Sequence, residues 1–326
     1  MDESKAERIL VIYRMLLNGI VVKRTALAQK FSVSEKTIQR DIEQLRIIIE
    51  KEPGGGLVFD RKLMGYVLRH DEQKVWLTNA EILALIKVLL ESRAFPKAEM
   101  NVLVDKLILL GSQDQHEYIK KVVENEKNLY LPLKHNKELF QIIWELSDAI
   151  RRNSQVDIEY ERVSDGKVKK STIMPVGLIF SEFYFYMVAY IKGSKHEYPA
   201  IYRLDRVINY KLKKDHFVDP GSVKFKEGEL RKRIQFMQAG EFMTIRFRFW
   251  GESLEAVLDR LPTAEVIEKD EKGVVVKAEV FGRGIKMWLL SQAQNIEVLY
   301  PMDLREEMAK TIKEMNRMYI SKKSLE

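Results

Sequence analysis

The chain has 326 residues, of which 46% are hydrophobic and 32% charged, and it contains no cysteine. This length exceeds the usual size of one hydrophobic core and predicts two or three domains in a folded globular protein. No apolar stretch has the roughly 20 residues that a membrane-spanning helix needs. Met1 is followed by Asp2, Glu3, Ser4 and Lys5, which is unlike the start of a secretory signal, and the lack of cysteine excludes disulfides. We therefore expect a cytoplasmic protein without a membrane partner.

The net charge of +7 is unevenly distributed along the chain. Residues 1–70 carry 13 Lys and Arg against 9 Asp and Glu, and residues 154–218 carry 11 against 8. A local excess of positive charge is typical of a surface that binds a polyanion. Solvated surfaces that differ by a few charges explain the same counts.

Three helices and a hairpin are predicted in the first seventy residues. Apolar residues at three- and four-residue spacing predict a first helix over residues 4–17. Thr25 is the expected N-cap of a second helix that ends at Phe31, and Ser34 is that of a third. The third helix is expected to bury Val33, Ile38, Ile42, Leu45 and Ile49. After it, three glycines precede a hairpin with strands over residues 57–60 and 65–68.

This order of elements predicts a winged helix-turn-helix that binds double-stranded DNA. Two short helices joined by a tight turn direct the start of the second of them at base edges in the major groove, and the helix dipole there favours phosphate. The candidate DNA-binding residues are Ser34, Lys36, Thr37, Gln39 and Arg40, with Lys23 and Arg24 as phosphate contacts. The alternative for Arg40 is an ion pair with Asp41 or Glu43 that only braces the helix.

The same residues carry a family resemblance. Residues 28–42, together with the later Gly65-Tyr66 pair, resemble the helix-turn-helix and wing of bacterial WYL-domain transcriptional regulators. The resemblance implies a DNA-binding domain over residues 1–70.

Residues 71–153 have no strand-like alternation and are predicted to form a helical connector. Thr78 and Glu81 form a capping box in front of a helix over residues 79–94, Pro96 begins a second helix, and a third is expected over residues 138–151. The broad apolar faces fit a homodimer that reads two half-sites about one helical turn apart. An intramolecular bundle explains the pattern equally well.

From Gln155 the hydrophobic period changes to two. Strands are expected over residues 156–160, 167–174, 176–180, 183–190 and 201–208, which implies a small, strongly bent sheet or barrel. One strand rich in aromatic residues is followed by one with two arginines. This combination suits single-stranded nucleic acid or a nucleotide, because bases stack on aromatic rings while guanidinium groups bind phosphate.

Here the resemblance to the WYL family continues. Pro175, residues 185–190 and residues 202–207 follow the order and spacing of the family's domain, although its Trp-Tyr-Leu triplet reads Phe-Tyr-Met here and Pro199-Ala200 stand where an arginine is common. The resemblance implies an SH3-like barrel that senses a ligand, with single-stranded DNA or nucleotides implied for some members. By position, the ligand-binding candidates are Tyr186, Arg203 and Arg206, with Tyr184 and Tyr202 as neighbours. The alternative is an aromatic core with a salt-bridged seam of arginines.

The last third of the chain predicts the element order β-α-β-β-α-β, which is typical of a ferredoxin-like sandwich. The strands are expected over residues 242–250, 265–269, 274–281 and 296–299, the helices over residues 252–261 and 284–293, and Pro301 precedes a final helix. A carboxy-terminal extension of this kind is common in the WYL family. Arg246 and Arg248 lie on its polar face, either as part of a ligand channel or subunit contact or simply in solvent.

Together these predictions describe an α+β multidomain protein with a winged helix-turn-helix (1–70), a helical connector (71–153), a small SH3-like β-barrel (154–220) and a ferredoxin-like α/β sandwich (221–326). The function expected is that of a sequence-specific DNA-binding transcriptional regulator in which an effector shifts the DNA-competent arrangement. We expect no catalytic residues, metal or cofactor, because five scattered histidines and the lack of a triad, phosphate loop or carboxylate cluster argue against an enzyme. The alternatives are a nucleic-acid-processing enzyme and an architectural DNA binder with little sequence preference.

Overall fold

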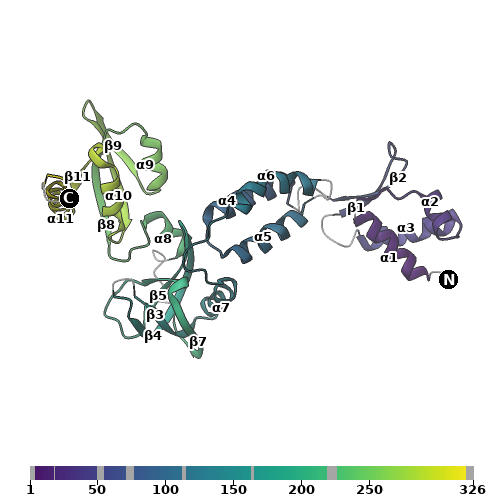
Figure 1. The fold of residues 1–326 in the computed structure, drawn as a ribbon, viewed down its shortest axis with the longest axis horizontal. Coiled ribbons are helices and arrows are strands. Elements are labelled where there is room, and N and C mark those ends of the chain that lie inside the picture. The colour runs from purple at the N-terminus through teal and green to yellow at the C-terminus, as the bar shows by residue number, and fades with distance from the viewer. Residues whose placement is uncertain are drawn as a thin grey trace. The chain divides into compact units, whose positions relative to one another are not determined.

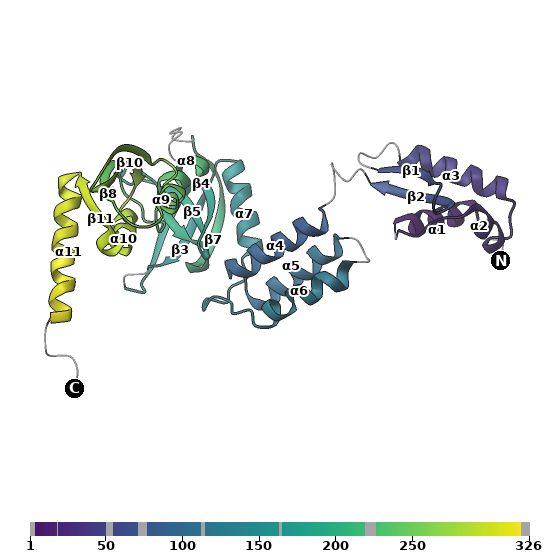
Figure 2. The ribbon, with the colours of Figure 1, turned by 90° about the horizontal axis from the view of Figure 1, so that it is seen from above.

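The structure is a computed structural model that describes residues 4–17, 19–49, 55–70, 77–111, 115–162, 165–218 and 226–320. It is a mixed α and β protein of two compact units, Met1–Leu133 and Lys134–Glu326 (Figures 1 and 2). Within the described ranges, no helix is both long and apolar enough to cross a membrane.

The first unit begins with a helix-turn-helix and a two-stranded wing, as predicted. Its elements are α1 (Lys5–Leu17), α2 (Arg24–Lys30), α3 (Glu35–Ile49), β1 (Gly55–Asp60) and β2 (Gly65–His70). Their shared core consists of Ile12, Leu16, Val22, Leu27, Ile38, Ile42, Leu45, Ile49, Leu57 and Tyr66. An isolated bridge between Val22 and Tyr66 attaches the segment before α2 to the wing.

The prediction of helix starts was right for α3 and wrong for α2. Ser34 caps α3, because its hydroxyl accepts a hydrogen bond from the backbone N–H of Thr37 at 3.2 Å. In contrast, α2 begins at Arg24 with Lys23 in the N-cap position and no side-chain cap, so Thr25 lies inside the helix. Extended backbone at Lys23 sets this start, which a capping pattern alone does not reveal.

Three further helices of the first unit pack against one another: α4 (Asn79–Ser92), α5 (Lys97–Leu109) and α6 (His116–Asn128). The capping box of α4 is confirmed, with Thr78 N–H donating to Glu81 Oε2 at 2.7 Å and Glu81 N–H donating to Thr78 Oγ1 at 3.3 Å. The sequence analysis missed α6, because its buried face consists of little more than Ile119 and Val123.

The second unit contains a five-stranded antiparallel sheet in the order β6-β5-β4-β3-β7. Its elements are α7 (Phe140–Arg151), β3 (Ser154–Glu161), β4 (Val168–Ser181), β5 (Tyr184–Ile191), β6 (Ala200–Arg203) and β7 (Val207–His216). The expected closed barrel is not formed by the described residues, since β6 and β7 are the two free ends of the strand order.

Two strand predictions in this sheet were wrong. Pro175 does not end a strand, because a bulge between Pro175 and Gly177 lets β4 continue to Ser181. The single strand expected over residues 201–208 is two strands, separated by the 3-10 turn Leu204–Arg206.

Each face of this sheet has its own core. On one side, Ile142, Leu146 and Ala149 of α7, with Leu139 directly before the helix, pack against β3, β4 and β5, so α7 shares the core of the sheet. On the other side, Ile179 and Val188 pack against Leu230 and Ile234 from the region of α8 (Glu227–Arg233). The strand alternation that places successive side chains on opposite faces explains both cores.

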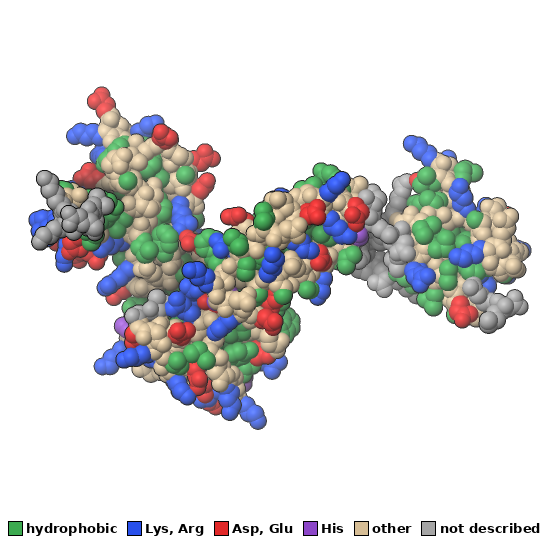
Figure 3. Space-filling view, in the orientation of Figure 1, with side chains coloured by type: hydrophobic (Ala, Val, Ile, Leu, Met, Phe, Trp, Pro, Cys, Tyr) green, Lys and Arg blue, Asp and Glu red, His purple; other side chains and the backbone are tan. Residues whose placement is uncertain are grey.

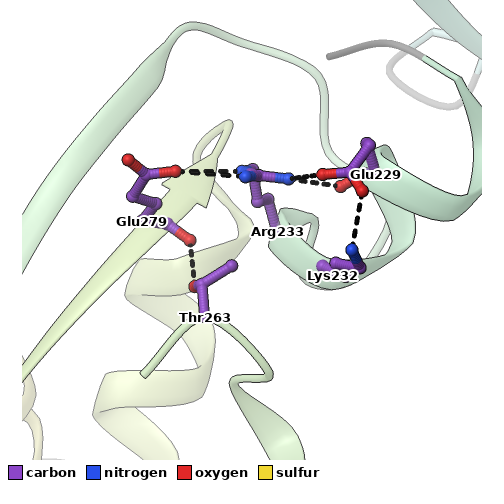
Figure 4. Close-up of polar contacts among 5 residues, drawn as sticks. All are labelled: Glu229, Lys232, Arg233, Thr263 and Glu279. Carbon is purple, nitrogen blue, oxygen red and sulfur yellow. Dashed lines mark hydrogen bonds and ion pairs between the residues drawn. The ribbon is translucent and has the colours of Figure 1, made fainter. Parts of the chain in front are cut away.

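The short helix α8 joins this sheet to the carboxy-terminal module. Glu227 Oε1 accepts a hydrogen bond from Leu178 N–H at 3.2 Å, directly after the β4 bulge. At the other end of α8, Arg233 donates to Glu229 on its own helix and to Glu279 on the neighbouring strand, and Thr263 donates to the backbone carbonyl of Glu279 (Figure 4). The helix therefore ties the two sheets to each other through both ends.

The carboxy-terminal module has the predicted element order β-α-β-β-α-β followed by a helix. Its elements are β8 (Phe242–Phe249), α9 (Leu254–Arg260), β9 (Glu265–Asp270), β10 (Gly273–Phe281), α10 (Gly284–Ser291), β11 (Ile296–Tyr300) and α11 (Met302–Ile320). The strands form an antiparallel sheet in the order β11-β8-β10-β9, which packs against α9, α10 and the first part of α11.

Candidate functional sites

The start of α3 is built around two hydroxyl groups. Ser34 Oγ lies 2.9 Å from Thr37 Oγ1 and accepts the Thr37 backbone N–H. Both predicted DNA-binding hydroxyls therefore hold the first turn of the helix together. The positive end of the helix dipole and the remaining N–H groups of that turn favour an anion at this position.

Lys36 and Arg40 lie one helical turn apart on α3, and both are exposed. Neither of them forms an ion pair within the described residues. The carboxylates that were considered as bracing partners of Arg40 are bound elsewhere, since Asp41 pairs with Arg8 at 2.6 Å and Glu43 with Arg46 at 2.9 Å. The structure thus places two cations on one face of α3 without local partners.

Gln39 has a different environment from its neighbours. Its side-chain oxygen accepts hydrogen bonds from Tyr66 OH at 3.0 Å and from Arg24 Nη1 at 3.3 Å, and its nitrogen donates to Glu43 Oε1 at 2.9 Å. Two donors satisfy both lone pairs of the amide oxygen. Gln39 and Arg24, both predicted to contact DNA, are therefore engaged with each other and with the wing.

The tip of the wing carries two exposed cations that the sequence analysis did not select, Arg61 and Lys62. Asp60 Oδ1 accepts the backbone N–H groups of Lys62 and Leu63 at 2.8 and 3.2 Å, which fixes the turn between β1 and β2. An Asp followed by two basic residues between two predicted strands was the available signal. On the face drawn in Figure 3, Lys and Arg side chains are interspersed with Asp and Glu, so charge alone does not locate a site on that face.

In the second unit, three of the five predicted ligand-binding residues share one face of the sheet. Tyr184 and Tyr186 alternate along β5, and Tyr186 lies opposite Arg203 in the strand register. The Arg203 guanidinium carbon lies 3.4 Å from the centre of the Tyr184 ring. Arg203 also donates from Nε and Nη2 to the two oxygens of Asp205 at 3.1 and 2.7 Å. This fork holds the guanidinium over the Tyr184 ring.

The surroundings of Tyr186 disfavour ionisation of its phenol. Burial raises the pKa of Tyr186 to about 12, so the hydroxyl is a neutral donor and acceptor at physiological pH. Burial is the largest single effect on Arg203 and lowers its pKa, but the hydrogen bonds and charge of Asp205, together with the nearby Tyr184 and Tyr186, outweigh it and raise the pKa of the guanidinium.

The other two predicted residues lie apart from this face. Tyr202 pairs with Met187 in the register, belongs to the core beneath α7, and packs edge-on against Tyr160 with ring centres 5.0 Å apart. Burial raises its pKa to about 12. Arg206 lies at the end of the 3-10 turn and is half-buried, where its charge acts on the hydroxyl of Tyr160.

Sequence reasoning missed a turn that borders Tyr184. The ring centre of His135 lies 6.4 Å from that of Tyr184, and His135 Nδ1 accepts the backbone N–H of Lys137 at 3.0 Å. Lys137 Nζ in turn donates to the carbonyl oxygen of Val207 at 3.3 Å. Burial lowers the pKa of His135, which matches an unprotonated Nδ1. No local pattern points to this turn, because its partners come from strands far along the chain.

Family models match three separate parts of the chain: an HTH domain over residues 8–57, a WYL domain over residues 141–212 and a WCX domain over residues 241–315. Over 328 aligned residues the chain is 22% identical to a protein of Bacillus subtilis (strain 168) described as the uncharacterized HTH-type transcriptional regulator YobV, with 97% of this chain and 99% of that protein covered.

Two solved structures are also similar in part. One is the proteasome accessory factor B/C (PafBC) of Arthrobacter aurescens, at 16% identity and a TM-score of 0.31, with 98% of this chain covered but only 50% of the other, so the chain spans half of its length. The other is a CRISPR Cas-related protein, at 15% identity and a TM-score of 0.36, with 87% of this chain and 73% of the other covered. On its three domain matches, in the order HTH, WYL and WCX, the chain belongs to the WYL-domain transcriptional regulators.

Proposed function

We propose that this protein is a sequence-specific DNA-binding transcriptional regulator whose WYL domain responds to a ligand. The observation that carries the DNA-binding part is the pair Lys36 and Arg40, exposed on one face of α3 while Asp41 and Glu43 are occupied by other partners. An arginine at this position of a recognition helix is suited to the O6 and N7 acceptors of guanine in the major groove.

The remaining basic residues of the domain suit phosphate contacts. Lys23 and Arg24 precede or begin α2, the hydroxyls of Ser34 and Thr37 hold the exposed start of α3, and Arg61 and Lys62 form the wing tip. Contacts with phosphate supply most of the sequence-independent affinity and position the recognition helix. This division of roles predicts that Arg40 determines sequence preference and that the other cations determine salt dependence.

The experiment is a selection of bound duplexes from random-sequence DNA, followed by anisotropy titrations of the selected duplex. Arg40→Ala is expected to weaken binding by about tenfold to a hundredfold and to relax the preference at one base pair. The matched control is Arg14→Ala, which removes the same charge from an exposed position on α1. If both variants bind like the wild type, the recognition-helix assignment is wrong, and if the wild type selects no sequence, the protein is not a sequence-specific binder.

The ligand that we infer for the WYL domain is single-stranded nucleic acid or a nucleotide. Tyr184 and Tyr186 offer aromatic surface, and Arg203 lies against them with its Nη1 outside the fork to Asp205. Flat rings beside a guanidinium group are suited to a base and its phosphate. Arg206 would add charge at the edge of this face, whereas Tyr202 would support it from the core.

This inference is tested by anisotropy with a fluorescein-labelled oligothymidylate and, separately, with ATP as a competitor. Tyr184→Ala and Arg203→Ala are each expected to weaken binding by about tenfold, the value typical of one stacked base. Lys214→Ala removes an exposed charge from β7 of the same sheet and serves as the control. Equal affinity in all four proteins would exclude this face as the nucleic-acid site.

We further propose that the protein acts in the cytoplasm as a homodimer and that the WCX module is a ferredoxin-like sandwich. Exposed apolar side chains on α4 and α5 and directly after α6 support self-association, among them Val88, Leu109 and Leu129, each 69% exposed. The strand order β11-β8-β10-β9, with two helices in the β-α-β-β-α-β sequence, supports the assignment of the module. Sedimentation equilibrium measures the oligomeric state directly.

A further inference from the structure

A pocket of about 820 Å³ opens on the WCX module beside the turn between β4 and β5. Phe236, Phe249, Trp250 and Trp288 contribute aromatic surface to its wall. The wall also holds a charged pair, because Glu182 from the β4–β5 turn meets Arg260 from the end of α9. The pocket is lined by two modules and lies apart from Tyr184 and Arg203, which do not line it.

The two partners in this pair use only part of their hydrogen-bonding capacity. Arg260 Nη2 donates to Glu182 Oε1 at 3.0 Å, but Arg260 Nε is shielded from solvent and has no hydrogen-bond partner among the described residues. Arg203 provides an internal comparison, since both its Nε and its Nη2 are satisfied by one carboxylate. A buried donor without an acceptor is destabilising. The Nε and Nη2 groups of Arg260 could bind both oxygens of one carboxylate, but in the part of the chain that the structure describes only Nη2 has an acceptor.

Glu182 is held in place at some cost to the backbone. Its φ angle is +56°, in the left-handed region that residues other than glycine seldom adopt. The turn that contains it leads directly into β5, which begins at Tyr184. The contact with Arg260 therefore connects the WCX pocket to the strand that carries the proposed WYL ligand face.

We propose that this pocket binds a small organic carboxylate with a flat apolar body. The ligand's carboxylate takes both Nε and Nη2 of Arg260 and replaces Glu182, while its ring packs against the aromatic wall. A two-point, charge-assisted contact is stronger than the single bond that Glu182 makes, and it satisfies the orphaned Nε. The volume lies within the range of sites for small molecules.

Occupation of the pocket has a structural consequence. Once Glu182 is displaced, the β4–β5 turn loses its tie to α9, and Tyr184 two residues later loses that constraint. The WCX module thus supplies a second effector site that acts on the WYL face without sharing its ligand. Both sites bias the same strand, which is the physical basis for coupling between them.

The test is isothermal titration of the full chain with benzoate and indole-3-acetate. Benzamide and indole-3-acetamide, which have the same rings without the charge, are the matched ligands. For molecules of this size we expect dissociation constants between about 10 μM and about 1 mM for the carboxylates. The amides should bind at least about tenfold more weakly, because they cannot form the charged fork.

Two substitutions are expected to act in opposite directions. Arg260→Ala should weaken carboxylate binding by at least about tenfold, whereas Glu182→Gln removes the competing charge and should strengthen binding by about threefold. Lys269→Ala, an exposed charge on β9, is the control and should leave binding unchanged. The proposal is overturned if Glu182→Gln binds neither carboxylate at about 10 mM, if Arg260→Ala binds as well as the wild type, or if amides and carboxylates bind alike. None of these readouts depends on DNA binding, so they fail or succeed independently of the proposed function.

Discussion

The phenol of Tyr66 in the wing donates a hydrogen bond to the side-chain oxygen of Gln39 in the recognition helix at 3.0 Å. Because Arg24 occupies the same oxygen and Glu43 the side-chain nitrogen, Gln39 connects α2, α3 and β2. We predict that Gln39 positions the wing and does not read a base. Gln39→Ala and Tyr66→Phe should each lower the affinity for the selected duplex by about twofold to tenfold, without changing which bases are selected.

A double-mutant cycle separates this role from base reading. Since one bond is lost in both variants, the double variant should bind no more weakly than the weaker single variant. Tyr66→Phe keeps the ring that packs edge-on against Phe59, so loss of the core is not the cause of its effect. A changed base preference in Gln39→Ala, together with an unchanged one in Tyr66→Phe, would instead assign Gln39 to the major groove.

Local patterns predicted the elements of this domain but not the partners of its side chains. The cap at Ser34 involves residues three apart and was predictable, whereas Gln39 and Tyr66 are 27 residues apart and meet only in the folded core. The alternation of side chains along a strand would have predicted that Tyr202 and Arg203 lie on opposite faces of the sheet, because they are successive residues. The opposite position of Tyr186 and Arg203 depends on register, which the turn between their strands does not specify.

In the five-stranded sheet of the second unit, residues that usually end a strand did not mark the observed strand ends. Pro175 and Gly177 are typical of strand ends, yet a bulge accommodates them within one long strand. The Arg203–Asp205 fork and the stacking on Tyr184 required the 3-10 turn that follows β6, and the sequence predicted an unbroken strand there. The face could therefore be predicted from family resemblance, but its geometry could not.

A second prediction concerns the buried ion pair between α1 and α3. Arg8 Nε lies 2.6 Å from Asp41 Oδ2, and both residues are buried, while Asp41 Oδ1 has no partner among the described residues. Asp41→Ala leaves an uncompensated buried charge and should destabilise the helix pair by about 3 to 5 kcal/mol. Replacing both residues, with Arg8→Met and Asp41→Leu, should restore most of the lost stability.

Hydrogen exchange of peptides from α1 and α3 measures this effect within the full chain. Protection should fall in Asp41→Ala and recover in the double variant. Arg14→Ala, an exposed change on α1, supplies the baseline. Protection in the double variant as low as in Asp41→Ala would mean that the pair itself, and not the unpaired charge, determines the stability.

A third prediction concerns pH and His135. Burial lowers its pKa, the nearby Asp205 opposes this shift, and Arg203 and Lys137 reinforce it. The unfolded chain therefore binds this proton more readily than the folded one, and the contribution of His135 is fully present above its ordinary pKa of about 6.5 and is lost as pH falls below it. Protonation also removes the acceptor for the Lys137 backbone N–H.

The measurement is the difference in unfolding midpoint between the wild type and His135→Gln at pH 7.5 and pH 5.5. The wild type should lose more stability than the variant on acidification, since glutamine does not titrate and its carbonyl can accept a hydrogen bond. His196→Gln, at an exposed position, is the control. An identical pH dependence in wild type and His135→Gln would contradict the assigned shift.

The last prediction uses two glycines with opposite environments. A Cβ at Gly284, the first residue of α10, would lie 1.7 Å from the backbone carbonyl oxygen of Gln235, in the segment that follows α8. A Cβ at Gly228, inside α8, would meet nothing within 4 Å. Gly284→Ala should therefore force α10 and that segment apart and destabilise the module by about 3 kcal/mol, the upper end of the usual range for overpacking. Gly228→Ala should stabilise α8 by up to about 1 kcal/mol, because alanine is the better helix former. Scanning calorimetry of both variants checks the signs, and equal melting temperatures would show that the close contact at Gln235 yields without cost.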